Sequence, residues 1–228
     1  MLNYSLPSFN DPAVLDESFS ARSSDTAVPV VKNQFGKRLF DVFVSSVVII
    51  SLLIWLVPII GLIIRLTSPG PMLFIQLRTG RNGKPFHCLK FRTMTYERNA
   101  QFRQATQNDN RVTRIGRFLR KSNLDELPQV FNVLFGHMSI IGPRPHPIQL
   151  DAQHWQTLPG YPARYVVKPG ITGLAQVRGC RGETSRIMDM KHRVRLDHFY
   201  IKKQSPLLDA AICWWTATKM LIGDKKAW

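Results

Sequence analysis

The chain has 228 residues, enough for one compact domain together with one membrane anchor. Lysine and arginine number 31 against 15 acidic residues, a formal net charge of +16, so its partners should be anionic: nucleic acid, lipid headgroups or phosphorylated substrates. The three cysteines are far apart and odd in number, which excludes a disulfide framework and a cysteine zinc site and fits a reducing cytoplasm.

Residues 1–33 combine prolines, serines and scattered acidic residues without a sustained apolar period, a pattern typical of a mobile tail. No positively charged start precedes an apolar run in this segment, so we expect no cleaved signal peptide.

Residues 42–64 form an uncharged, largely apolar segment of 23 residues that could cross a bilayer core. Pro58 lies inside it, where the ring removes a backbone donor and kinks a helix. Basic residues are balanced on the two flanks, so neither flank has the composition of a translocated side. Two topologies remain open: a kinked spanning helix, or a re-entrant helix that breaks at Pro58 and returns to the same face.

The part after this segment predicts a helix-rich α+β domain. Strands are predicted at residues 72–77 and 86–91, on either side of a basic loop. Residues 111–121 predict a helix that is basic on one side and apolar on another, and Ser205 with Pro206 predicts the start of a final amphipathic helix. Each helix could lie on anionic lipid or could pack as an ordinary surface or core helix.

Asp125 and Glu126 are adjacent carboxylates with arginines on both sides in the sequence. An acidic pair alone is common at solvated helix starts. Arg120 precedes this pair, however, and Arg144 follows it in a Gly-Pro-Arg-Pro run, and a carboxylate that attacks a phosphate needs cations around it. Mg²⁺ commonly completes such a site. The pattern predicts a centre for chemistry on phosphates.

Further basic and polar residues could assist this centre. Lys90 and Arg92 alternate with apolar residues and would share one face of a strand, where they could bind phosphates. The turn at 168–173 could present backbone amides to a nucleotide, although turn chemistry alone accounts for it. We expect His146 at the surface.

From about residue 34 to residue 222 the sequence resembles the bacterial sugar transferase family, the monotopic polyprenyl-phosphate phosphoglycosyl transferases. Five motifs occur in the family order and are specific when taken together: Lys-Arg-Leu-Phe-Asp at 37–41, Lys-Phe-Arg-Thr-Met at 90–94, Leu-Asp-Glu-Leu-Pro-Gln at 124–129, Gly-Pro-Arg-Pro at 142–145 and Pro-Gly-Ile-Thr-Gly at 169–173.

The resemblance implies that Asp125 is a nucleophile, which attacks the sugar-bearing phosphate of a UDP-sugar, releases UMP and carries the phosphosugar covalently. Polyprenyl (undecaprenyl) phosphate would then take that group, in the initiating step of exopolysaccharide or other surface glycan synthesis. Glu126 would act beside Asp125, and both would hold Mg²⁺. The phosphate-binding residues it implies are Lys90, Arg92, Arg120 and Arg144.

The resemblance also implies a re-entrant anchor at residues 34–66 and a catalytic domain at 67–228 with interfacial helices, on the cytoplasmic face of the bacterial inner membrane. This would be a minimal form of the enzyme. Its partners would be a UDP-sugar, polyprenyl phosphate and membrane lipids, with no nucleic acid. The family usually has serine before the helix-breaking proline, whereas Val57 precedes Pro58 here.

Alternatives remain open for the sugar and for the function. The segment 179–184 is similar to that of members that transfer glucose 1-phosphate, which favours UDP-glucose; UDP-galactose or an N-acetylated UDP-sugar stays possible. A basic membrane-bound protein that binds nucleic acid or lipid would explain the charge and the apolar segment. It would not explain the acidic pair between arginines, and no known nucleic-acid-binding signature is present.

Overall fold

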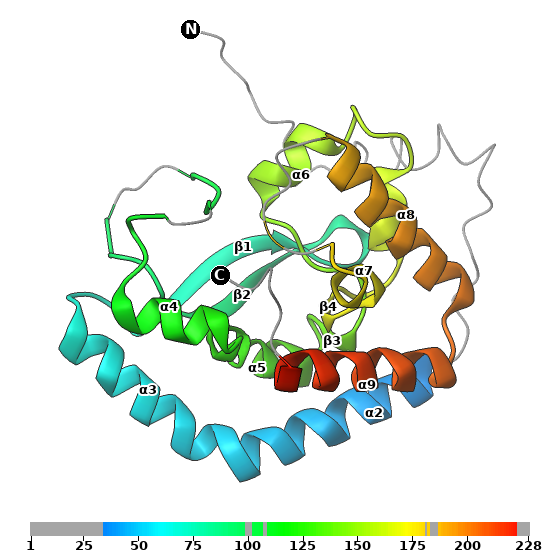
Figure 1. The fold of residues 1–228 in the computed structure, drawn as a ribbon. Helices are drawn as coiled ribbons and strands as arrows, with labels where there is room; N and C mark the ends of the chain where they lie inside the picture. The colour runs from blue at the N-terminus through cyan, green and yellow to red at the C-terminus, as the bar shows by residue number, and fades with distance from the viewer. Residues whose placement is uncertain (1–33, 99–101, 107–108, 181, 183–186, 223–228) are drawn as a thin grey trace, which may run out of the picture.

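A computed structural model describes residues 34–98, 102–106, 109–180, 182 and 187–222 (Figure 1). The predicted tail at 1–33 and part of the sugar-related segment at 179–184 lie outside these residues. The chain is a helix-rich α+β protein, as predicted. Its longer helices are α2 (Gln34–Val48), α3 (Ile54–Thr67), α4 (Arg114–Lys121), α8 (Ile187–Lys203) and α9 (Pro206–Ile222). The shorter ones are α5 (Gln129–Leu134), α6 (Ile148–His154) and α7 (Leu174–Val177), with 3₁₀ turns η2 (Arg81–Gly83), η3 (Leu124–Glu126) and η4 (Tyr161–Val166).

The apolar segment forms one helical run, Phe35–Thr67, which is long and apolar enough to cross a membrane by length and composition. Only 22% of its most apolar stretch is buried inside the protein, unlike the core helix of a soluble domain. Figure 1 shows α2 and α3 meeting at an angle along one side of the molecule.

The irregular turn of this run lies before the predicted break. A π-helical turn, η1 (Ile49–Leu53), joins the two helices, and the Ile54 N–H reaches back to the carbonyl of Ile49. Pro58 lies inside α3. Within η1 the Ser51 hydroxyl donates to the Val47 carbonyl at 2.7 Å, a local bond that bends helices. The bend of the helical run therefore has two causes before Pro58, the π-helical turn and the Ser51 bond, in addition to the backbone donor that Pro58 removes.

Both strands predicted from the sequence are present, with shifted ends. β1 (Leu73–Thr79) and β2 (Pro85–Phe91) pair antiparallel over seven residue pairs, from Leu73 opposite Phe91 to Thr79 opposite Pro85. The turn between them is possible because Asn82 adopts a left-handed backbone with φ 55°.

A second, parallel pair was not predicted. β3 (Ser139–Ile141) lies beside β4 (Gly170–Thr172), and the Gly170 N–H donates to the Pro143 carbonyl at 2.9 Å. That contact requires glycine, since a Cβ on Gly170 would lie 2.0 Å from the backbone nitrogen of Gly142. The Gly170 amide therefore holds the parallel pair and is not presented to a nucleotide.

Apolar clusters join these elements into one body. The largest lies among β3, η4, α7, α8 and α9, and its fully buried members include Ile141, Tyr200 and Ile212. Another contains Ile64, Phe91 and Leu119, and so packs α3 against β2 and α4.

The start of α2 is fastened to the body by the basic and acidic residues of the 37–41 motif. The Asp41 carboxylate accepts from Ser139 Oγ at 3.0 Å and from the Ile140 N–H at 2.9 Å. Arg38 donates to the carbonyls of Val133 and Leu134 at 2.6 and 2.7 Å, where it satisfies the free end of α5. The motif therefore ties the first helix of the apolar run to β3 and α5.

Candidate active site

The two acidic residues lie on η3, a short turn directly after α4. Thr113 caps α4 by accepting from the Gly116 N–H at 3.0 Å, so the helix begins later than the predicted 111. A Cβ on Gly116 would lie 2.0 Å from the carbonyl oxygen of Thr93, so glycine lets α4 approach the segment after β2. Asn123, with φ 58°, then turns the chain into η3.

Glu126 is held by two cations from distant segments. Lys90 Nζ on β2 lies 2.6 Å from Oε1, and Arg144, from the loop after β3, donates to Oε1 at 2.5 Å and to Oε2 at 3.1 Å. A bidentate arginine fixes the plane of the carboxylate. Burial alone would raise the pKa of Glu126, but Arg144 and Lys90 hold it well below its usual range. Glu126 is therefore an ionised, oriented carboxylate.

Asp125 differs from its neighbour. It is 9% exposed, and among the residues that the structure describes no hydrogen bond or ion pair fixes its carboxylate. Burial raises its pKa, while the positive charges of Lys90 and Arg120 oppose that rise. The carboxylate thus keeps lone pairs that a structural ion pair would use.

Arg120 lies on α4 beside this pair. Its Nε donates to Thr93 Oγ1 at 2.9 Å, and this bond holds the guanidinium against the segment that follows β2. Burial lowers the pKa of Arg120 and the charge of Asp125 raises it. The structure thus brings together five residues that the sequence singled out: Lys90, Arg120, Asp125, Glu126 and Arg144.

Arg92 lies outside this cluster. It therefore differs from the prediction that Lys90 and Arg92 would face phosphates together from one side of a strand. β2 ends at Phe91, so the alternation that would align Lys90 with the next basic residue stops there. The Arg92 side chain is buried, and it donates to the carbonyl of Ser68 at 2.8 Å and to that of Pro69. It closes the C-terminal end of α3 instead of facing the acids.

The donor set fits a magnesium ion that is shared with a substrate. Over the described ranges no group of three or more His, Cys, Asp and Glu residues converges, and Asp125 with Glu126 supplies two carboxylates. Mg²⁺ is typically held by one or two carboxylates together with substrate phosphates. Since Lys90 and Arg144 engage both oxygens of Glu126, Asp125 has the freer carboxylate of the two. Magnesium binding itself stays a prediction.

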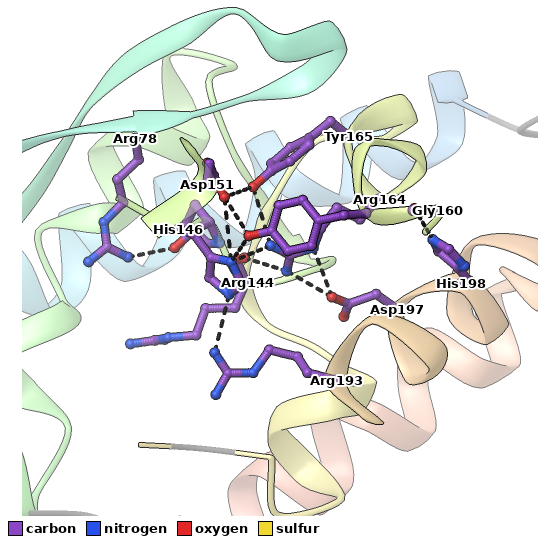
Figure 2. A network of polar contacts seen from close by, with 12 residues as sticks. Arg78, Arg144, His146, Asp151, Gly160, Arg164, Tyr165, Arg193, Asp197 and His198 are labelled. Carbon is purple, nitrogen blue, oxygen red and sulfur yellow. Dashed lines mark hydrogen bonds and ion pairs between the residues drawn. The ribbon is translucent and has the colours of Figure 1, made fainter. Parts of the chain in front are cut away.

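A buried polar network behind Arg144 was missed from the sequence (Figure 2). His146, expected at the surface, is 2% exposed, and its Nδ1 lies 2.6 Å from the hydroxyl of Tyr161 and 2.7 Å from Nη1 of Arg164. Burial and the nearby arginines lower the pKa of His146 well below its usual range, so it is neutral. The Tyr161 and Tyr165 hydroxyls both donate to Asp151 on α6, at 2.6 and 2.5 Å.

Arg164 connects this network to the Arg144 loop. It donates to the Asp197 carboxylate of α8 at 2.7 and 3.1 Å and to the backbone carbonyl of Arg144 at 2.8 Å. Arg78 of β1 donates to the neighbouring carbonyl of Pro145 at 2.8 Å. These bonds hold the backbone that presents Arg144 to Glu126. The contributing residues come from β1, the loop after β3, α6, η4 and α8, and no local pattern in the sequence shows that these segments meet.

Residues 32–223 match the family model described as bacterial sugar transferase. The chain is 47% identical over 191 residues to a UDP-glucose:undecaprenyl-phosphate glucose-1-phosphate transferase of Klebsiella pneumoniae, which covers 83% of this chain and 41% of that protein. Identity to a Caulobacter vibrioides protein of the same name is 44% over 198 residues, 86% of this chain and 74% of the relative.

A UDP-N-acetylgalactosamine-undecaprenyl-phosphate N-acetylgalactosaminephosphotransferase of Aeromonas hydrophila is 40% identical over 192 residues, 83% of this chain and 44% of the relative. The chain thus spans about two fifths of the length of the Klebsiella and Aeromonas proteins. The matched range contains the five motif segments and the site residues Lys90, Arg120, Asp125, Glu126 and Arg144. The chain belongs to the bacterial sugar transferase family.

Proposed function

We propose that the protein transfers a sugar 1-phosphate from a UDP-sugar to undecaprenyl phosphate, with release of UMP. The observation that carries this proposal is the contrast between the two acids: Glu126 is fixed by Lys90 and Arg144, whereas Asp125 beside it is left with a free carboxylate. The names of the Klebsiella and Caulobacter relatives support the reaction.

The reaction proceeds by two displacements at one phosphorus atom. A carboxylate oxygen of Asp125 attacks the sugar-bearing phosphate; the bond between the two phosphates of the UDP-sugar breaks, and UMP leaves with that bridging oxygen. An oxygen of undecaprenyl phosphate then attacks the same phosphorus, and the bond to Asp125 breaks. The product is an undecaprenyl diphosphate sugar and the carboxylate is restored, so the protein begins a lipid-linked glycan.

The cations of this cluster lower the free energy needed to bring a substrate phosphate to the carboxylate of Asp125. Lys90 and Arg120 face Asp125 with positive charge, and Arg144 orients Glu126 next to the reacting carboxylate. Mg²⁺, held by Asp125 with Glu126, would neutralise phosphate charge when bound. Arg92 is not assigned a phosphate, because carbonyls at the end of α3 occupy its guanidinium.

UDP-glucose is the donor that we propose, because the Klebsiella and Caulobacter relatives carry that name. The Aeromonas relative is named for UDP-N-acetylgalactosamine, which keeps N-acetylated donors, with UDP-galactose, as alternatives for the donor panel below.

The anchor at 34–66 is proposed to be re-entrant, with the catalytic domain at 67–228 on the cytoplasmic face of the inner membrane. Both ends of the apolar run contact the same body: Arg38 and Asp41 bind α5 and β3 at its start, and Ile64 packs with Phe91 and Leu119 at its end. A spanning helix would place its ends on opposite faces of the bilayer. Exposed Phe118 on α4 and Trp214 on α9 support interfacial placement of those helices.

The test measures UMP release from UDP-glucose, UDP-galactose and N-acetylated UDP-sugars in a membrane mimic, with and without undecaprenyl phosphate and Mg²⁺. Without undecaprenyl phosphate the wild type should release at most about one UMP per protein, and with it release should continue. Asp125→Asn should release none, and Glu97→Gln, which removes one exposed acid elsewhere, should behave like the wild type. A peptide that contains Asp125 should gain the mass of a phosphosugar when the acceptor is withheld.

Several outcomes would refute the proposal. Turnover by Asp125→Asn at a rate near that of the wild type would remove the nucleophile. Release of UMP without a covalent adduct would replace the double displacement by direct transfer. No release from any donor, together with binding of nucleic acid or lipid vesicles, would favour the non-catalytic reading.

A further inference from the structure

Figure 1 shows α9 beside α2, on the side of the molecule that carries the apolar run. A large apolar groove is lined by residues of both helices. Its volume is about 670 Å³, within the range of about 300–1,000 Å³ that is typical of ligand sites. Small residues, Gly36, Ala210 and Ala217, leave room between the helices, and Phe40 and Trp214 supply apolar walls. Phe40 is 42% exposed and Trp214 is 69% exposed, so neither wall is closed by the rest of the protein.

A small polar pocket adjoins this groove. Lys37 and Gln204 line both, and the polar pocket is also lined by Arg38, Asp41 and Lys168. The two pockets therefore lie side by side, and together they form a depression with a charged end and an apolar end. That arrangement matches an amphiphile, a molecule with a polar headgroup and a long apolar chain.

The charged end has an excess of positive charge over its acids, since Lys37, Arg38 and Lys168 lie there with Asp41 and Asp209. Lys37 is paired with Asp209 at 2.6 Å, and the Asp41 carboxylate accepts from Ser139 and Ile140. Arg38 is bonded to backbone carbonyls of α5, which leave its charge in place. Within the described chain Lys168 makes no hydrogen bond or ion pair, and burial, with Arg38 nearby, lowers its pKa.

Arg38 and Lys168 converge on one point. A Cβ on Gly136 would lie 3.5 Å from Arg38 Nη2 and 3.6 Å from Lys168 Nζ, so both cations border the same glycine turn. Lys168 can donate to a phosphate oxygen beside this turn, and the charge of Arg38 adds to the attraction. Gln204 Oε1, where the pocket meets the groove, is buried without a partner among the described atoms and can accept from a hydroxyl.

We propose that this depression binds one anionic membrane phospholipid of the phosphatidylglycerol type. Its phosphate lies at the mouth of the polar pocket against Lys168, with the charge of Arg38 beside it; a headgroup hydroxyl donates to Gln204, and one acyl chain fills the groove between α2 and α9. The lipid thereby fastens the last helix to the anchor at the bilayer surface. This inference is independent of the proposed transfer reaction.

A membrane lipid suits the depression better than the lipid acceptor of the transferase. The cations that act on Asp125 most strongly are Lys90, Arg120 and Arg144, and neither Arg38 nor Lys168 is among them. A phosphate bound at Lys168 would therefore lie outside the cluster that reacts. The depression is a binding site for a lipid that stays, not for one that is consumed.

The test uses the full chain in nanodiscs that contain equal amounts of phosphatidylglycerol and phosphatidylcholine. The lipids that remain bound after transfer to detergent are counted by native mass spectrometry. The wild type should retain one phosphatidylglycerol. Lys168→Gln should weaken that retention by about tenfold, the loss expected for a charge-assisted hydrogen bond. Lys191→Gln, which removes an exposed lysine of α8, should retain it like the wild type.

A second variant and a second readout separate lipid loss from misfolding. Ala217→Phe should fill the groove and reduce retention of both lipids while the far-ultraviolet circular dichroism stays unchanged. Cys213 also lines the groove, so phosphatidylglycerol should slow its reaction with a maleimide in a Cys180→Ser background. Neither measurement depends on turnover, so each can fail while UMP release succeeds.

Three results would overturn the inference: equal retention of the two lipids by the wild type, unchanged retention in both Lys168→Gln and Ala217→Phe, or displacement of the bound phosphatidylglycerol when polyprenyl phosphate is added to the nanodiscs. The last result would assign the depression to the acceptor.

Discussion

Replacing Asp197 by asparagine should destabilise the domain strongly, because it leaves a buried arginine without its counter-charge. Arg164 has no exposed side-chain surface, and Asp197 accepts two of its hydrogen bonds at 2.7 and 3.1 Å. Burial works against the charge of Arg164, but Asp197 raises its pKa well above the usual value, so the guanidinium stays charged in the folded protein. Asparagine keeps the size of the side chain and removes the negative charge.

The expected cost is about 3–5 kcal/mol, the range for breaking one side of a buried ion pair. For a domain of this size 1 kcal/mol corresponds to about 2–4 °C in Tm, so Tm should fall by about 6–20 °C. Activity should fall further than the folded fraction, since Arg164 also bonds the Arg144 carbonyl at 2.8 Å.

The assay is thermal unfolding in detergent, followed by near-ultraviolet circular dichroism, for Asp197→Asn and for Glu97→Gln as the control at an exposed acid. The double variant Arg164→Met with Asp197→Leu should recover part of the loss, because it buries no unpaired charge. A loss below about 1 kcal/mol in Asp197→Asn, the range of exposed pairs, would refute the account of the network as a buried, charged support.

Three other changes test the site and the anchor. Lys90→Gln should move the acidic limb of the kcat/KM profile to higher pH: Asp125 must be ionised to attack, burial raises its pKa, and Lys90 opposes that rise; a limb that stays in place would contradict this. Gly116→Ala should cost about 1–3 kcal/mol in chemical unfolding, since its Cβ would lie 2.0 Å from the Thr93 carbonyl oxygen, and a neutral result would show that α4 can shift. Pro58→Leu should favour a spanning helix, visible as loss of cytoplasmic labelling at the N-terminus; retained labelling would give the turn at η1 the larger part.

Elements with a local signal were predictable from the sequence. The uncharged run at 42–64 can only be a membrane or core helix. Two strand-like runs on either side of a polar turn were sufficient to predict the hairpin of β1 and β2. Ser205 followed by Pro206 marked the start of α9, where Ser205 Oγ accepts from the Leu208 N–H at 3.2 Å. Charge chemistry also indicated that Arg144 lies near the acids at 125–126, whereas its ion pair with Glu126 was not predicted.

Features that depend on distant segments were decided only by the tertiary structure. β3 and β4 have three residues each and are far apart in the chain, too short for any periodicity to register. Arg92 and Lys90 look equivalent in sequence, and they differ because the strand ends between them and α3 supplies free carbonyls to one alone.

His146 shows the same limit, since its burial comes from tyrosines and arginines of η4 and α8 that no local pattern links to it. The sequence by itself determined the apolar segment, the longer helices and the first two strands, the excess of positive charge and the position of the acidic pair, because each depends on neighbours within a few residues. The tertiary structure decided which cation holds which carboxylate and which stays free, because those choices depend on contacts between residues far apart along the chain.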